Sequence, residues 1–297
     1  MQSSGSSWTA TESATSIGDT PPRSRFALRG RSVRLDGRTE AVRRDLADIR
    51  LADRVFAPHY AVAVRRSVGR MTDVTTSAGG PVLSQLLPGE PFDVLEFTST
   101  HAWGRSPIDG SVGLVARDAL IGEYAVSHIV VVRESVVHAD RSTATPLPMP
   151  LPMGARVAAT VTGDWAEVDG GYVPAEHLRA LSDLSGDAVA AALALRGVAV
   201  VAGGRSGAGV DAAGLIFLAH GITGEAPARF VDLQAAEFGV ALAGGDPLRR
   251  GDLLFFADHV AMLVDGDTAI HADGSVTVEP IAALDRFGPV LARRRPA

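Results

Sequence analysis

The glycine-rich stretch 203–209 precedes an apolar segment and is the first place where the residue pattern suggests ligand chemistry. Gly207, Gly209 and Ala212 fit the GxGxxG/A pattern that brings a pyrophosphate onto a helix N-terminus. A dinucleotide site also needs a second strand that ends in an acidic residue about 20 positions on, and this context is missing. A P-loop is excluded because no lysine follows, and a GxSxG serine motif fails because Ala208 replaces its second glycine. Nucleotide binding is therefore disfavoured, and no cofactor is expected.

Cysteine is absent from the 297 residues, which excludes disulfides, thiolate metal sites and catalysis by a thiol of this chain. The eight histidines never form the HExxH or paired spacing of a zinc site, so no metal is expected. His177 and His220 are expected at the surface.

The formal net charge is −6, and every basic side chain is an arginine. Nucleic acid is an unfavourable partner, because phosphate binding needs a concentrated basic surface. The one dense basic run, residues 293–295, is interpreted as a solvated tail.

No apolar run approaches the roughly 18 residues of a membrane helix, so no membrane span is expected. Residues 1–25 lack the apolar segment of a secretory signal; we expect a disordered leader over residues 1–44 and a cytoplasmic protein, with cell-envelope association left open.

Residues 182–297 read as helices followed by strands. Helix formers at 187–195 follow Ser185, a suitable cap, and a second helix is expected over 212–220, capped by Asp211. The strands predicted after these helices are 253–256, 259–264, 269–271 and 276–278. Helices followed by an antiparallel sheet predict an α+β domain.

Two stretches of short strands precede that domain, residues 45–122, with a helical lead-in, and residues 123–181. They share a turn with Pro and Gly, then a tryptophan (Trp103 and Trp165), then a glycine that leads into a valine-containing strand. This internal repeat predicts two small β-barrels and resembles tandem bacterial SH3-like domains. Proline-rich residues 146–152 are interpreted as a loop of the second copy.

Several separated motifs of the last third share their order and spacing with one protein family. The motifs are Asp-Ala-Ala-Gly-Leu at 211–215, Arg-Phe-Val-Asp-Leu-Gln at 229–234, Leu-Arg-Arg-Gly-Asp-Leu-Leu-Phe at 248–255, His-Val at 259–260, Ile-His-Ala at 270–272 and Val-Glu-Pro at 278–280. Together they resemble the NlpC family of papain-like cell-wall cysteine peptidases. The resemblance implies a papain-like fold for residues 182–297.

The resemblance also implies a relay of nucleophile, base and orienting group. The family's catalytic cysteine, activated at a helix N-terminus, corresponds to Ala212, the base to His259 and the orienting residue to His271. The methyl group of Ala212 can neither ionise nor attack. Substrate-binding positions implied by the resemblance are Asp211, Ala213 and Arg229.

The pocket implied by the family has lost more than its nucleophile, because Val200 and Ala202 replace an aromatic pair and Phe230 and Val231 replace a polar pair. We therefore predict a pseudoenzyme that binds peptidoglycan stem peptides or a protein partner. The alternative is an active γ-D-glutamyl-L-diamino-acid endopeptidase seen with its cysteine replaced at position 212. A natural and an engineered replacement both remain open.

Overall fold

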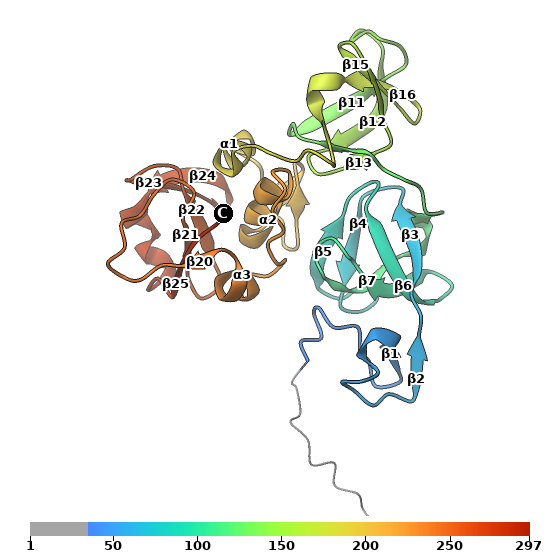
Figure 1. The fold of residues 1–297 in the computed structure, drawn as a ribbon, viewed down its shortest axis with the longest axis horizontal. Coiled ribbons are helices and arrows are strands. Elements are labelled where there is room, and N and C mark those ends of the chain that lie inside the picture. Colours follow the sequence, from blue (N-terminus) through green and yellow to red (C-terminus); the bar gives the residue numbers. More distant parts are fainter. Residues whose placement is uncertain (1–34) are drawn as a thin grey trace, which may run out of the picture. The chain divides into compact units, whose positions relative to one another are not determined.

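The computed structural model describes residues 35–297, whose strands form three larger sheets and three small ones (Figure 1). Residues 1–34 of the predicted leader lie outside the described residues. In its described end, residues 35–44, Ala41 is buried and Asp36 forms an ion pair with Arg38. No helix of the described part is long and apolar enough to cross a membrane.

The expected helical lead-in is only partly helical. It holds the parallel strands β1 (Leu46–Asp48) and β2 (His59–Ala61), and its only helical turn in the described range 45–61 is the 3-10 helix η1 (Ile49–Leu51). Asp48 caps this turn by accepting a hydrogen bond from the Arg50 N–H, which explains why the helical signal of the sequence yields one turn here.

A seven-stranded antiparallel sheet follows over residues 64–121, the first β-region. Its order is β5-β4-β8-β7-β6-β3-β9. The strands are β3 (Val64–Val68), β4 (Thr72–Thr75), β5 (Val82–Leu86), β6 (Pro91–Phe97), β7 (His101–Arg105), β8 (Val112–Ala116) and β9 (Leu120–Ile121), with the 3-10 helix η2 (Arg117–Ala119) before β9. Its core contains Val68, Leu86, Phe92 and Val115, whose side chains are fully or almost fully buried.

Residues 128–180, the second β-region, form a three-stranded sheet of order β13-β10-β17 and a five-stranded sheet of order β12-β11-β16-β15-β14. The elements are β10 (His128–Val130), β11 (Glu134–His138), β12 (Pro146–Pro152), β13 (Arg156–Val157), β14 (Thr160–Thr162), β15 (Trp165–Val168), β16 (Gly171–Pro174), the 3-10 helix η3 (Ala175–His177) and β17 (Leu178–Ala180). No closed barrel is seen among the described strands of either region, so the two SH3-like barrels stay a prediction.

The interpretation of residues 146–152 as a loop is wrong, because they form β12, which pairs antiparallel with β11. Proline cannot donate to a strand ladder, but β12 is the outer strand of its sheet, where one side of the strand needs no donors.

The C-terminal region, residues 182–297, confirms the prediction of a mixed fold with few helices and an antiparallel sheet. The sheet has the order β20-β25-β21-β22-β23-β24. The elements are α1 (Ala188–Ala194), β18 (Arg205–Ser206), β19 (Gly209–Val210), α2 (Ala212–Gly221), α3 (Val231–Glu237), β20 (Val240–Ala241), β21 (Leu253–Phe255), β22 (Val260–Leu263), β23 (Thr268–Asp273), β24 (Ser275–Pro280), the 3-10 helix η4 (Ile281–Phe287) and β25 (Ala292–Arg295).

Alternation along β21 and its extension gives this sheet two apolar faces. Leu253 and Phe255 belong to a core that includes α1 and α2, whereas Leu254 and Phe256 belong to a second core that includes Leu284 of η4. Helix α2 is apolar on all sides and is buried along almost its whole length against β22 and β23.

Three smaller sequence predictions for this region are wrong. Residues 293–295 are not a solvated tail but lie in β25, between β20 and β21, where Arg295 forms an ion pair with the buried Asp252 at 2.7 Å. Asp187 caps α1 in place of Ser185, since its carboxylate accepts from the Val189 and Ala190 N–H groups. His220 is buried, with Nδ1 bonded to Glu225 and its ring against Phe238.

Candidate functional site

Helix α2 begins at Ala212, as the sequence predicts, and its first turn is firmly positioned. The Asp211 carboxylate accepts from the Gly214 N–H at 2.7 Å and from the Gly203 N–H at 3.0 Å. Gly214 lies against the glycine-rich stretch, because a Cβ on it would meet the Gly204 carbonyl oxygen at 2.0 Å. The helix start is therefore fixed at Ala212, the residue that the resemblance predicts at the nucleophile position.

The structure brings His259 and His271 together. Nε2 of His259 lies 3.0 Å from Nδ1 of His271, and Nε2 of His271 lies 3.4 Å from Oε2 of Glu279, an electrostatic contact without hydrogen-bond alignment. If the Nε2 proton of His271 faces this carboxylate, Nδ1 of His271 accepts from His259. In this tautomer Nδ1 of His259 carries no proton and can accept one.

An aromatic side chain covers the histidine pair. Phe287 of η4 stacks on His259 with ring centroids 3.9 Å apart and meets His271 edge-on. Burial and the neighbouring His271 lower the pKa of His259 to about 4. Burial likewise lowers the pKa of His271, although Glu279 opposes this shift. Both rings are therefore neutral near pH 7, the form in which an imidazole accepts a proton.

Ala212 and the histidine pair occupy different surroundings. Ala212 belongs to the core on the α2 side of the sheet, whereas His271 contacts Phe287 on the η4 side, and His259 lies at the end of β22. The convergence of Ala212 with His259 stays a prediction.

The predicted substrate-binding residues gather around the start of α2, and their polar atoms are used within the chain. Arg229 is almost fully buried and donates to Asp211 through Nη1 at 3.0 Å and Nη2 at 2.7 Å. Ala213 is also buried, and its carbonyl oxygen accepts from Gln234 at 3.1 Å. Their contact with a substrate stays a prediction.

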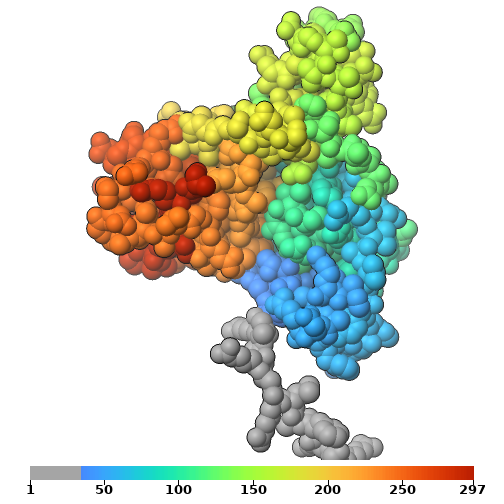
Figure 2. Space-filling view, viewed as in Figure 1, coloured from blue at the N-terminus to red at the C-terminus, as the bar shows by residue number. Residues whose placement is uncertain are grey.

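A buried network of charges, the arginine network, joins the glycine-rich stretch to the first β-region, and the two regions are in direct contact (Figure 2). Arg205 donates from Nη1 to Glu90 at 2.9 Å, and its Nε lies 3.2 Å from Asp109. Burial opposes ionisation of Asp109, but Arg205 and the hydroxyls of Ser111 and Ser84 hold its pKa below the usual value. Ser84 also accepts from Arg229 at 3.0 Å, so the network continues to Asp211 and the helix start.

Sequence reasoning missed Glu90, Asp109 and Arg205 of this network because the ion pairs join residues that are about a hundred positions apart. It also missed the contacts of Glu279 and Phe287, although Glu279 stands in the closing Val-Glu-Pro motif. The available signal was a carboxylate within the strand that pairs with the His271 strand, where Glu279 lies opposite Ala269.

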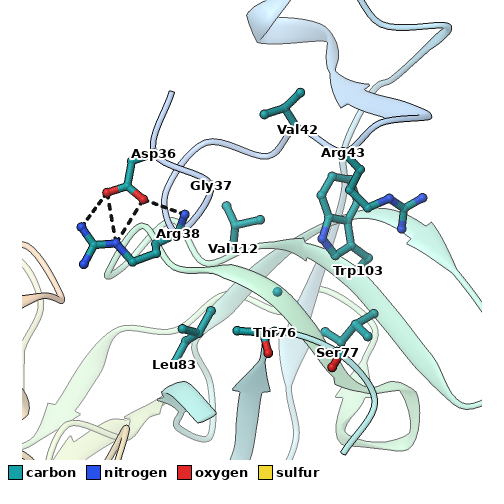
Figure 3. A pocket seen from close by; sticks show the side chains of 12 residues that line it. Asp36, Gly37, Arg38, Val42, Arg43, Thr76, Ser77, Leu83, Trp103 and Val112 are labelled. Carbon is teal, nitrogen blue, oxygen red and sulfur yellow. Dashed lines mark hydrogen bonds and ion pairs between the residues drawn. The ribbon is translucent and has the colours of Figure 1, made fainter. Parts of the chain in front are cut away.

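The cavities of the described residues lie away from Ala212 and the histidine pair. One cavity of about 470 Å³ lies between residues 36–43 and the first β-region, with Trp103 and Ser77 in its wall and Arg43 over the indole ring (Figure 3). Ala212, His259 and His271 line none of the five cavities described. In residues 35–297, no cluster of three or more His, Asp or Glu side chains is placed to hold a metal ion.

Comparison with known proteins gives a match by structure and none by sequence. No family model matches the chain, and no curated protein does. An NlpC/P60 family protein from Bacillus cereus superposes with a TM-score of 0.67 and 16% identity over 78% of this chain and 99% of its own. An NlpC/P60 endopeptidase from Photobacterium damselae superposes with a TM-score of 0.54 and 12% identity over 75% of this chain and 67% of its own. This chain therefore has the fold of NlpC/P60 proteins.

Proposed function

We propose that this chain is a non-catalytic NlpC/P60 protein that binds peptidoglycan stem peptides without cleaving them. Membership of the family is supported by the shared fold together with the motifs at Asp211, His259 and His271. We further propose that the two β-regions are SH3-like domains, which is supported by their matched tryptophan and glycine motifs.

The observation that carries the proposal is an alanine at the first residue of α2 in a chain that keeps the histidine pair. Asp211 caps the helix, so a thiol at position 212 would lie at a helix N-terminus. Burial and His271 keep His259 neutral, the form in which the base implied by the resemblance accepts a proton. The chain has no cysteine, hence no thiolate and no covalent acyl intermediate can form.

Peptide binding is supported by apolar surface next to the helix start. Val200, at one of the two positions where the resemblance implies an aromatic residue, is 38% exposed, and the neighbouring Val201 is 40% exposed. Val200 bridges to Val210 just before Asp211. A stem peptide placed there would contact these valines while its scissile bond faces a methyl group.

Calorimetric titration with stem tri- and tetrapeptides, with mass spectrometry of the same samples, tests this function. We expect saturable binding and intact peptides. Val200→Asp is expected to weaken binding about tenfold, because it places a charge on the apolar contact surface. Val240→Asp is the matched control, since Val240 is 71% exposed on β20 and should leave binding unchanged.

Cleavage of the peptide by this chain would overturn the non-catalytic assignment. An absence of binding by a folded protein, verified by its thermal unfolding, would overturn the peptide-binding assignment.

A further inference from the structure

A cavity of about 240 Å³ lies where the two β-regions meet α2, away from Ala212 and the histidine pair. Its walls come from Glu90, Pro107 and Ile108 of the first β-region, from Ile129, Gly154 and Arg156 of the second, and from Arg205, Phe217, Leu218, Gly221, Ile222, Glu225 and Ala226 of the C-terminal region. The cavity therefore joins three parts of the chain that are distant in sequence.

Arg156 is the one basic wall residue without an acidic partner in residues 35–297. Its Nε is buried and has no hydrogen-bond partner there. Of the acidic wall residues, Glu90 pairs with Arg205, and the Glu225 carboxylate bonds to Nδ1 of His220. Burial lowers the pKa of Arg156, Glu90 opposes the shift and Arg205 adds to it. An anion in the cavity that met the guanidinium group would neutralise this cation.

The backbone fixes Arg156 at this place. Arg156 is in β13, paired with Ile129 of β10, and its N–H donates to the Pro88 carbonyl at 2.8 Å. Gly89 permits this close approach, because a Cβ on it would lie 1.9 Å from the Arg156 carbonyl oxygen. A guanidinium on such a rigid strand loses little freedom when it binds a ligand.

Most of the remaining wall is apolar, with Phe217, Leu218 and Ile222 of the α2 end opposite residues of the β-regions. A ligand that fits has one negative group for Arg156 and an apolar tail for this wall. A dianion suits the cavity less well, because the carboxylates of Glu90 and Glu225 are also part of it. We propose that this cavity binds a small monocarboxylate with a short apolar chain, anchored by Arg156.

Calorimetry and thermal unfolding of the full chain with butyrate, hexanoate and octanoate test this site. We expect one site per chain, a Tm that rises with ligand concentration, and binding of hexan-1-ol that is at least about tenfold weaker than that of hexanoate. Inorganic phosphate is the second anion, and its binding in preference to hexanoate would overturn the ligand class. An absence of carboxylate binding at millimolar concentration would overturn the site.

Two variants test separately whether hexanoate binding needs the charge of Arg156 and the open volume of the cavity. Arg156→Met is expected to abolish hexanoate binding without lowering the Tm of the free protein, because it removes a partly buried cation that has no acidic partner. Gly221→Leu keeps Arg156 and places a side chain in the cavity wall, where an added Cβ meets no atom within 4 Å. It should also abolish binding.

Arg44→Met is the control, because Arg44 is exposed on the segment before β1. It should bind hexanoate like the unmodified chain. Unchanged binding in both Arg156→Met and Gly221→Leu would place the ligand elsewhere and overturn the proposal.

Discussion

The arginine network and the histidine pair both adjoin the core of the C-terminal region. They differ in whether each polar side chain meets the partner that its chemistry requires. In the network, Arg205 meets Glu90 and Asp109, and Arg229 meets Asp211. In the histidine pair, Glu279 contacts His271 and His271 contacts His259. The resemblance implies Ala212 as the next residue of this relay, and its side chain is only a methyl group. The charges of the arginine network are therefore matched by opposite charges, whereas the histidine pair contacts no reactive group at the position that the resemblance predicts for a nucleophile.

Arg205→Ala should have the largest effect on stability. It leaves Glu90 and Asp109 buried without their cation, which typically costs about 3–5 kcal/mol of unfolding free energy. Arg250→Ala is the control, because its ion pair with Asp187 is exposed and is worth less than about 1 kcal/mol. Urea unfolding of both variants measures the difference, and equal losses would show that the network does not carry stability.

Asp211→Ala is expected to have the next largest effect, about 2–3 kcal/mol. The change removes the cap of α2 and leaves the buried Arg229 without its carboxylate. Asp187→Ala removes only the cap of α1 and an exposed ion pair, so about 1 kcal/mol is expected. The same urea unfolding experiment compares the two, and a larger loss for Asp187→Ala would contradict the role of Asp211 in the network.

The pH dependence of stability tests the burial of the histidine pair. The folded pKa of His259, about 4, is below its unfolded value near 6.5, so the unfolded chain binds more protons in between. The stability that depends on a neutral, buried His259 is therefore fully present above pH 6.5 and is lost as the pH falls towards 4. We expect His259→Gln to reduce the loss of unfolding free energy between pH 7 and 5 by about 1–2 kcal/mol. Parallel pH profiles for the two proteins would exclude a buried neutral His259.

Ala212→Cys should change least. One added sulfur at a helix start is expected to alter the unfolding free energy by less than about 1 kcal/mol. The helix terminus should lower the thiol pKa below its usual value, as measured by alkylation rate against pH. We still expect little stem-peptide hydrolysis, because Val200, Ala202, Phe230 and Val231 replace pocket residues and positioning carries part of any barrier. Robust hydrolysis would show a competent pocket and favour the endopeptidase alternative.

The sequence predicted those parts that local pattern determines. Asp211 before an apolar run indicated the start of α2, and the segments 253–256 and 259–264 were predicted as strands, in agreement with β21 and β22. The pairing of His259 with His271 followed from the family resemblance rather than from the pattern.

Other features depended on tertiary context that the sequence does not display. Arg205 finds Glu90 only after the first β-region folds, and Phe287 covers His259 only because η4 returns to the sheet. The arginines of 293–295 look solvated by charge alone, yet Arg295 meets the buried Asp252 and β25 completes the sheet.

Strand β12 has a consequence for association between molecules. An outer strand offers unpaired N–H and C=O groups to which a strand from another molecule can add. Four of the seven residues of β12 are prolines, Pro146, Pro148, Pro150 and Pro152, and none of them has an N–H to donate. Addition of a further strand at this side of the sheet is therefore disfavoured, so the prolines protect the second β-region against edge-to-edge aggregation.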